Sequence, residues 1–408
     1  MPGIEVLDQP IPVNVYEGQD FYVPAFEIKV EGQNASANDI MSVTYTDDLD
    51  QIDSFDLTVN NWDPGAHRNE PEIWRQSGNF KYSDKEAYNP WKDVEVWMGY
   101  IRNGMRDLRC MLTGEITTLH PNFPSSGPPT LGVGGLNLLH RFRFQQESKD
   151  FFNKTDAEIA QTIVDDIAKE LKKKSPLLNL RLDGQGLPSQ VRLKHIAMHN
   201  QFPIVFLRER ARALGYEMIM EETSSQKDRT VTLRFAPTHT VKRKTYVLEW
   251  GKTLLSFQPT LQTANQVAEL TVRGWNPQTK EQIKYVAKRQ DLPGIIIPDD
   301  LGLAEPTIVQ KKEIVVDYPT QDQAEAKAVA EDRLRQICET IVVAKGKTVG
   351  LPELRAGVKI LIKGLGKRFS GPGFGPKQKS FAYLVTSTTH SIGDGGYTTD
   401  FSARMEIL

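Results

Sequence analysis

The sequence predicts a mainly β protein with α+β insertions, in which two related antiparallel β-barrels flank a smaller α+β domain. Three observations lead to this fold class: period-two apolar patterns in the first and last thirds, helical periodicity in the middle, and similar segments that recur in the same order. A chain of 408 residues also exceeds what one hydrophobic core usually organises. The predicted domains are a first barrel over 1–145, an α+β domain over 146–250, and a second barrel over 251–408 with an insertion at about 278–340.

The first third alternates apolar and polar residues in short segments bounded by Gly, Pro and Asn, as half-buried antiparallel strands require. A later segment, residues 61–92, is rich in turn formers and contains Trp62, Trp74 and Trp91. Side chains of this size favour packing of the loop onto its own barrel or onto a neighbouring subunit, and a sugar-binding platform is the alternative. The clearest strands are predicted over 26–30, 55–59 and 94–98.

Helical signals begin near residue 155. Thr155 and Glu158 have the spacing of a capping box, and apolar residues then recur at every fourth position from Ile159 to Leu171. This pattern predicts a helix over about 155–173. Two more helices are predicted over 203–214 and 320–338, and further strands over 217–221, 230–235, 358–362, 381–385 and 397–407.

The first and last thirds of the chain resemble each other. The strongest match shares Leu-Thr-Val followed by Trp and then Asp-Pro or Asn-Pro, and two weaker matches follow in the same order. Any two β-domains share strand composition, so chance similarity is the alternative, but the common order favours a duplication. Three chains with two similar barrels each would present six similar units around a threefold axis. The matching segments are 56–64 with 269–277, 94–100 with 358–364, and 111–119 with 383–391.

The composition excludes several classes of protein. Lys and Arg number 50 against 52 for Asp and Glu, so the chain lacks the positive field that drives direct, sequence-specific nucleic-acid binding. Two cysteines cannot form a disulfide framework or a four-cysteine zinc site. No apolar run approaches the roughly 20 residues that span a bilayer, and the amino end lacks a signal-peptide pattern. We expect synthesis in the bacterial cytoplasm and no membrane contact in the resting state.

The sequence contains no motif for catalysis, cofactor binding or metal binding. Its histidines lack the spacing of zinc ligands, and its glycine-rich stretch lacks the Gly-Lys-Ser/Thr of a phosphate loop. We therefore expect no catalytic residues, no cofactor and no metal. Asp47, Asp48, Asp50 and Asp53 form an acidic stretch, but a calcium loop would also need a Gly and a distal Glu. This stretch is predicted to be a solvated hairpin tip.

Six segments carry motifs that are loose individually and specific together: 24–30, 40–63, 111–116, 199–215, 250–275 and 395–399. Together they resemble the phage late control protein D family, over nearly the whole chain. That family includes the central hub of contractile phage baseplates and the amino-terminal hub region of the VgrG spike proteins of type VI secretion. The resemblance implies two tail-tube-like barrels per chain. It also implies a homotrimer that forms a pseudo-hexameric ring between a sixfold inner tube and a threefold spike.

The resemblance further implies a structural, non-enzymatic role with an inner tube protein, a spike protein and other baseplate components as partners. The chain ends at Leu408 without the needle segments of fused VgrG chains, so a separate spike protein is expected. In such a ring, the hairpin with Asp47, Asp48, Asp50 and Asp53 would contact the tube or line its lumen. The loop with Trp62, Trp74 and Trp91 would lie between subunits. The particle would be a phage tail, or an extracellular or cell-anchored contractile injection system.

Two other functions stay open from the sequence. A tail-associated peptidoglycan hydrolase would need an acid of raised pKa and a partner carboxylate. Glu209 and Glu217 are available in the middle domain, but the arginines that flank Glu209 would lower its pKa. A glycan-binding tail adhesin would instead use the loop that contains Trp74.

Overall fold

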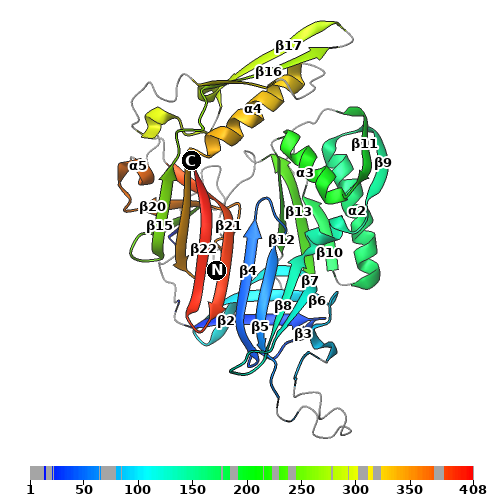
Figure 1. Cartoon of the computed structure of the whole chain (residues 1–408), viewed down its shortest axis with the longest axis vertical. Coiled ribbons are helices and arrows are strands. Elements are labelled where there is room, and N and C mark those ends of the chain that lie inside the picture. Colours follow the sequence, from blue (N-terminus) through cyan, green and yellow to red (C-terminus); the bar gives the residue numbers. More distant parts are fainter. Residues whose placement is uncertain are drawn as a thin grey trace.

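The protein, described here from a computed structural model, is mainly β, with most helices at the periphery of the strands (Figure 1). Within the described residues, no helix is long and apolar enough to cross a membrane. The structure describes residues 13–14, 21, 23–63, 65, 80–83, 85–175, 178–183, 192–214, 216–222, 229–237, 245–276, 279–292, 294–301, 311–315, 323–371 and 381–407.

The first strand set consists of β2 and β4 to β8, which pair antiparallel in the order β2–β6–β7–β8–β5–β4. Asn103 and Gly104 join β6 to β7, and both have positive φ (50° and 74°), as a tight hairpin turn requires. The strands predicted over 26–30, 55–59 and 94–98 are confirmed. The elements are β2 (Pro24–Val30), β3 (Gln33–Asn34), β4 (Ile40–Asp48), β5 (Ser54–Asn60), η1 (Glu86–Tyr88), β6 (Asp93–Arg102), β7 (Met105–Asn122) and β8 (Thr130–Asn137).

The second strand set consists of β14, β15 and β19 to β22, which pair in the order β14–β20–β21–β22–β19–β15. All of these pairs are antiparallel except β14–β20. The three strands predicted after residue 357 are confirmed. The elements are β1 (Val13–Asn14), which pairs with β14, then β14 (Thr245–Glu249), β15 (Leu254–Leu261), β19 (Val342–Val349), β20 (Lys359–Lys363), α5 (Gly366–Ser370), β21 (Phe381–Gly393) and β22 (Gly396–Ile407).

The two strand sets repeat one pairing order. In chain order, β2, β4, β5, β6, β7 and β8 correspond to β14, β15, β19, β20, β21 and β22. The sets differ in one strand direction, because β2 is antiparallel to β6 whereas β14 is parallel to β20. A β-bulge lies between Ile116 and Thr118 where β7 pairs with β8, and another lies between Val385 and Ser387 where β21 pairs with β22. A bulge inserts one extra residue into one strand of a pair. Its recurrence at the same place therefore supports a duplicated unit and equates Thr118 with Ser387.

The structure corrects which segments are equivalent. β5, which contains Leu57 to Val59, corresponds to β19, whereas Leu270 to Val272 lie in β16, outside both strand sets. The strongest sequence match is therefore not a structural equivalence. The two segments look alike because both strands alternate buried and less buried positions. The two weaker matches do join corresponding strands, β6 with β20 and β7 with β21. The second match is wrong in register, because it aligns Thr118 with His390, whereas the bulges equate Thr118 with Ser387.

A segment between β15 and β19 forms a unit of its own, in which β16 pairs with β17 and β18 and helix α4 packs on the sheet. Its core includes Leu270, Val272, Ile283, Ala330 and Leu334. The helix predicted over 320–338 is confirmed by α4, although Thr320 lies outside the described residues. The predicted domain bounds stay a prediction. The elements are β16 (Glu269–Asn276), β17 (Glu281–Lys288), η3 (Arg289–Asp291), η4 (Pro298–Leu301), β18 (Lys312–Val315) and α4 (Gln323–Glu339).

The two strand sets join directly, because residues 43–48 of β4 pair antiparallel with residues 387–392 of β21. Both sets thus belong to one fourteen-stranded sheet, and Figure 1 shows β4 and β5 beside β21 and β22. Each set buries its own apolar cluster, which fixes the register of its strands. These clusters include Val43, Phe55, Leu57, Val96 and Leu112 in the first set, and Leu248, Ile360, Tyr383, Val385 and Phe401 in the second.

The middle segment packs helices α2 and α3 against two small sheets, β9–β11 and β10–β13–β12. The helices predicted over 155–173 and 203–214 are confirmed, and Gly215, the expected end of the second, lies outside the described residues. Ile159, Ile163 and Leu171 face the core, as the fourfold periodicity requires. The elements are η2 (Leu138–Arg143), β9 (Glu147–Lys154), α2 (Asp156–Lys174), β10 (Leu178–Asp183), β11 (Leu193–Gln201), α3 (Pro203–Leu214), β12 (Tyr216–Glu222) and β13 (Arg229–Pro237).

Replacement of Thr155 by Ala is expected to lower the free energy of unfolding by about 1 kcal/mol. The Thr155 side chain accepts from the backbone N–H of Glu158, and the Glu158 carboxylate accepts from the backbone N–H of Thr155, so the change removes one half of a formed capping box. Urea unfolding followed by circular dichroism measures the loss. The control is Lys169→Ala on the exposed side of the same helix, which should shift stability by less than about 0.5 kcal/mol. Equal stabilities for the two variants would contradict a role for the cap.

Candidate functional site

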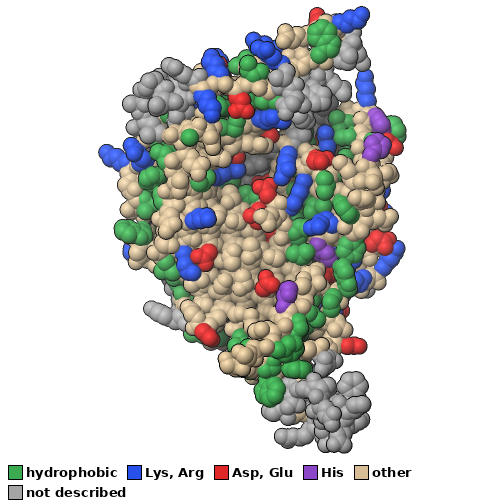
Figure 2. Space-filling view, in the orientation of Figure 1, with side chains coloured by type: hydrophobic (Ala, Val, Ile, Leu, Met, Phe, Trp, Pro, Cys, Tyr) green, Lys and Arg blue, Asp and Glu red, His purple; other side chains and the backbone are tan. Residues whose placement is uncertain are grey.

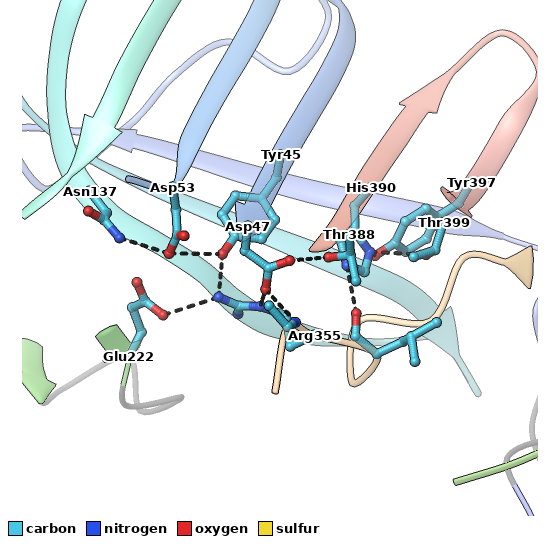
Figure 3. A network of polar contacts seen from close by, with 12 residues as sticks. Tyr45, Asp47, Asp53, Asn137, Glu222, Arg355, Thr388, His390, Tyr397 and Thr399 are labelled. Atoms are coloured by element: carbon cyan, nitrogen blue, oxygen red, sulfur yellow. Dashed lines mark hydrogen bonds and ion pairs between the residues drawn. The ribbon is translucent and has the colours of Figure 1, made fainter. Parts of the chain in front are cut away.

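A buried polar network lies where β4, β12 and β21 meet the loop before β20, and Arg355 is at its centre (Figure 3). Arg355 Nε donates to Asp47 Oδ2 at 2.7 Å, and Arg355 Nη2 donates to the Tyr45 hydroxyl. The same guanidinium lies 3.5 Å from Glu222 Oε2, and its carbon sits 4.7 Å from the centre of the Tyr45 ring. One side chain from the second half of the chain thereby holds groups of the first strand set and of the middle segment.

The two buried aspartates of the network are held by several donors. Asp47 retains only 4% of its exposure and also accepts from the Ala356 backbone N–H at 3.0 Å and from the Thr388 hydroxyl. Asp53 accepts from Asn137 Nδ2 at 2.7 Å and from the Tyr45 hydroxyl at 3.5 Å. Buried carboxylates of this kind are stable only when such donors replace water.

His390 extends the network across the second strand set. Its ring is fully buried, its Nε2 lies 2.9 Å from the Leu354 carbonyl oxygen, and its Nδ1 lies 3.0 Å from both the Tyr397 and the Thr399 hydroxyls. The carbonyl accepts only from a protonated Nε2, so Nδ1 is the acceptor for a hydroxyl. Burial lowers the pKa of His390 to about 4 and keeps the ring neutral at pH 7.

Burial shifts the pKa values of the other titratable groups in opposite directions. It raises the pKa of Asp53 well above the usual range, with further increases from the charges of Asp47 and Glu222. It raises the pKa of Glu222 to about 7, although the Arg355 charge opposes this increase. Burial alone would lower the pKa of Arg355, but its acidic neighbours and Tyr45 raise it well above the usual range. The guanidinium therefore keeps its charge, and the network can exchange a proton at one of its carboxyl groups near neutral pH.

A second polar cluster connects β7 to η2 and α2. The Glu115 side chain is 1% exposed, lies 2.6 Å from His140 Nε2, and accepts from Arg141 and Lys174. Burial would raise the pKa of Glu115, but hydrogen bonds from these three residues outweigh it and lower the pKa to about 2. Glu95 of β6 pairs with Arg229 of β13 at 2.7 Å and adds a further link from the first strand set to the middle segment.

The acidic stretch is only partly the solvated hairpin tip that the sequence predicts. Asp48 and Asp50 lie near the surface, where Asp48 Oδ1 accepts from the Asp50 backbone N–H at 2.7 Å. Asp47 and Asp53 are buried, so the prediction is wrong for these two. The reason is tertiary: β21 pairs with the end of β4, and the covered strand turns Asp47 toward Arg355. Contact with a tube, or a place in its lumen, stays a prediction for this hairpin.

The structure describes two of the three tryptophans that we assigned to an inter-subunit loop. Trp62 is 44% exposed and forms a backbone bridge with Phe80. Trp91 is 53% exposed, and its ring stacks on His140 with a centroid distance of 6.2 Å and an angle of 28°. Trp74 lies outside the described residues. Their place between subunits stays a prediction, and the ring contact holds the Trp91 side chain close to its own chain.

Sequence reasoning missed the residues that organise the network. Arg355 lies in a loop without periodicity, and nothing in its neighbours marks a partly buried arginine. Glu222 ends β12 after an exposed Glu221, so it reads as the second of two surface carboxylates. His390 is a weak signal, because it occupies an apolar position in an alternating strand. Their side chains meet only because three segments distant in the sequence converge.

The contacts of this network hold together parts of the chain that are far apart in the sequence. Carboxyl groups of raised pKa occur at active sites, but structural ion-pair networks produce the same shifts. The two residues considered for hydrolysis lie elsewhere: Glu209 is exposed on α3 and accepts from Gln201 at 3.3 Å, and Glu217 is buried on β12. Among the described residues, no three His, Cys, Asp or Glu side chains are grouped so as to hold a metal ion.

The fold is that of phage tail proteins. The 43 kDa tail protein of prophage MuSo2 from Shewanella oneidensis superposes with a TM-score of 0.63 at 12% identity, covering 93% of this chain and 98% of that chain. An E. coli component of the type VI secretion system, itself similar to T4 tail proteins, gives 0.54 at 12% identity, with 92% and 76% covered. A chain of the Francisella PdpA–VgrG complex gives 0.51 at 11% identity, with 96% and 59% covered. At these identities the likeness concerns the fold.

A family model described as the Alg8 N-terminal domain matches residues 21–377. The chain belongs to this family. The description differs from that of the late control protein D family, so membership in the latter stays a prediction. No curated protein matches the chain.

Proposed function

We propose that the protein is the structural hub of a phage-tail-like baseplate or contractile injection system, a trimer whose ring adapts a sixfold inner tube to a threefold spike. The observation that carries this proposal is the repeated topology within one chain. Three copies would place six similar strand sets around an axis and keep true threefold symmetry. A trimer of this one kind of chain could then match six tube subunits on one side and three spike subunits on the other.

The polar junction between the two strand sets supports this role. An adaptor must hold its two halves in a fixed relation, because each half contacts a different tube subunit. Arg355 and Asp47 form a charged, hydrogen-bonded pair between the halves, in a site that is largely shielded from water. Breaking such a pair leaves a buried charge without a partner, which disfavours alternative placements of the halves.

The neighbours of known structure support the same assignment, since they are a phage tail protein, a type VI secretion component and a chain of a VgrG complex. On this basis we propose an inner tube protein, a separate spike protein and other baseplate components as partners. The protein would be made in the cytoplasm and would act within the assembled particle. Figure 2 shows positive and negative side chains interspersed on the visible face, which agrees with protein partners rather than nucleic acid.

We also propose that the chain is not an enzyme. The polar groups with shifted pKa values are engaged with one another, and burial leaves little room for a substrate among them. A hydrolase based on Glu209 would have to use an exposed carboxylate that accepts a hydrogen bond from Gln201. Zymogram clearing that disappears in Glu209→Gln would contradict this part of the proposal.

The purified chain is expected to behave as a trimer, with a mass three times its 46.0 kDa. Multi-angle light scattering after size-exclusion chromatography measures this at micromolar concentration. Class averages from electron microscopy should show a hollow ring of six similar lobes. A stable monomer that co-purifies with neither a tube protein nor a spike protein would overturn the hub assignment.

A further inference from the structure

The strand that joins the two sets inside the chain is β4, and its counterpart β15 has one edge on which no described strand pairs. β4 skips Met41 where it pairs with β5, and β15 skips Leu255 where it pairs with β19. Both skipped side chains point outward, with 50% and 51% exposure. This shared bulge equates Ser42 with Ser256, and the equivalence continues residue by residue along both strands. Within the chain β4 pairs with β21. By analogy, β15 is expected to pair with a strand that corresponds to β21.

Two strand edges are open among the described residues. No described strand pairs with β15 on the side away from β19. β6 accompanies β7 only as far as Glu115, so residues 118–122 pair with β8 on one side and with no described strand on the other. The corresponding stretch of β21, from Ser387 onward, is the part that β4 covers.

Resting on the proposed hub function, we infer that β15 of one chain pairs antiparallel with the end of β7 in the next chain, in the register of the internal β4–β21 junction. The partner is a second copy of this chain, and the contact closes after three copies. The residue pairs are obtained by replacing each residue of the β4–β21 ladder with its equivalent in β15 or β7, as the two shared bulges define it. The pairs are Thr118 with Gln262, Leu119 with Leu261, His120 with Thr260, Pro121 with Pro259, Asn122 with Gln258, and Phe123 with Phe257.

The side chains on the two open edges fit such a contact. Inside the chain, the pair of Asp47 and Thr388 is polar and needs Arg355 for compensation. Its counterpart between chains would be Leu119 and Leu261, both partly buried against the cores of their own sets. Phe123, just after β7, is 58% exposed, and Phe257 of β15 is partly buried. Pairing would remove these apolar surfaces from water, which favours association.

Two prolines make the junction between chains weaker than the one within the chain. The Leu49 N–H donates to the Thr386 carbonyl at 3.0 Å. Pairs that exchange backbone hydrogen bonds alternate along an antiparallel ladder with pairs that do not, so Tyr45 and His390, four positions further along, are also a hydrogen-bonded pair. The transferred pair is Pro121 with Pro259, and proline has no N–H. Proline on an open edge also limits indiscriminate strand pairing. The apolar contacts would therefore carry most of the association.

Engineered disulfides test the register. His120→Cys with Thr260→Cys places two cysteines at a pair that does not exchange backbone hydrogen bonds, where the Cα atoms are close enough for a disulfide. Thr46→Cys with Thr389→Cys is the matched internal control, because these hydroxyls lie 3.3 Å apart at the corresponding pair. The native cysteines Cys110 and Cys338 are both buried. Mild oxidation of the full chain at micromolar concentration, followed by non-reducing electrophoresis, gives the readout.

The expected result is a ladder of dimer and covalent trimer for the 120/260 variant, and a band of monomer mass with a protected thiol pair for the 46/389 variant. His120→Cys with Gln258→Cys, which is out of register, should give at least fivefold less covalent trimer. Light scattering of the unoxidised variants is run in parallel. A trimer without the 120/260 linkage would overturn this interface and leave the hub assignment intact. A monomer throughout would overturn both, and equal linkage in both registers would overturn the register.

Discussion

Replacement of Arg355 by Met is expected to lower the free energy of unfolding by about 3–5 kcal/mol, the range found when one partner of a buried ion pair is removed. The change keeps most of the side-chain volume and takes away the charge that faces Asp47, Tyr45 and Glu222. Asp47 would then stay buried with only the Ala356 N–H and the Thr388 hydroxyl as donors. Urea unfolding at pH 7, fitted with a common m-value, measures the loss.

The matched control is Arg106→Met, because Arg106 pairs with Glu27 at 3.2 Å on the surface and its side chain is 57% exposed. Its expected effect is below about 0.5 kcal/mol. A double variant, Asp47→Asn with Arg355→Met, should recover part of the loss, since it removes both charges. If Arg355→Met cost no more than Arg106→Met, the network would not hold the strand sets together.

Replacement of Glu222 by Gln is expected to change how stability depends on pH. Burial raises the pKa of Glu222 to about 7, so the folded protein binds this proton more tightly than the unfolded chain does. For a raised pKa, the stabilising contribution is complete below the unfolded value, near 4.5, and is lost as the pH rises through about 7. Glu222→Gln keeps the neutral form at every pH. Its stability relative to the natural chain should rise by roughly 3 kcal/mol between pH 4.5 and pH 8.

The measurement is a series of urea unfolding curves at fixed ionic strength for both proteins. His390 has a lowered pKa and loses its contribution as the pH falls from 6.5 toward about 4, but it is common to both proteins and cancels in the difference. Glu221→Gln is the control, because this neighbour is 47% exposed and pairs with Arg234 on the surface. Parallel pH curves for the natural chain and Glu222→Gln would show that Glu222 ionises in the folded state as it does in water.

These expectations concern the same physical requirement. Alternation of apolar and polar residues defines the register within each strand set, but it does not define how one set is placed against the other. Direct pairing of β4 with β21 fixes one direction, and the charged groups around Arg355 make other placements costly. We expect the weaker, apolar edges of β15 and β7 to associate only when another copy presents the complementary edge.

The sequence by itself determined the elements and indicated that some of them repeat. The stripe from Ile159 to Leu171, with the cap at Thr155, specifies α2, because helical periodicity and capping are local properties. Alternation specifies strands such as β5 and β6 for the same reason. The order of weak matches along the chain indicated a duplication, and the repeated topology agrees with it.

Only the tertiary structure decided which strands correspond and which polar residues are buried. Leu270 to Val272 match β5 in sequence and lie in a separate sheet, because local alternation carries no information about the neighbouring strand. Asp47 belongs to an acidic stretch, yet β21 covers it and Arg355 neutralises it. Burial of a charge depends on partners that are hundreds of residues away. A short segment of sequence therefore cannot reveal it, whereas helices and strands follow from their nearest neighbours.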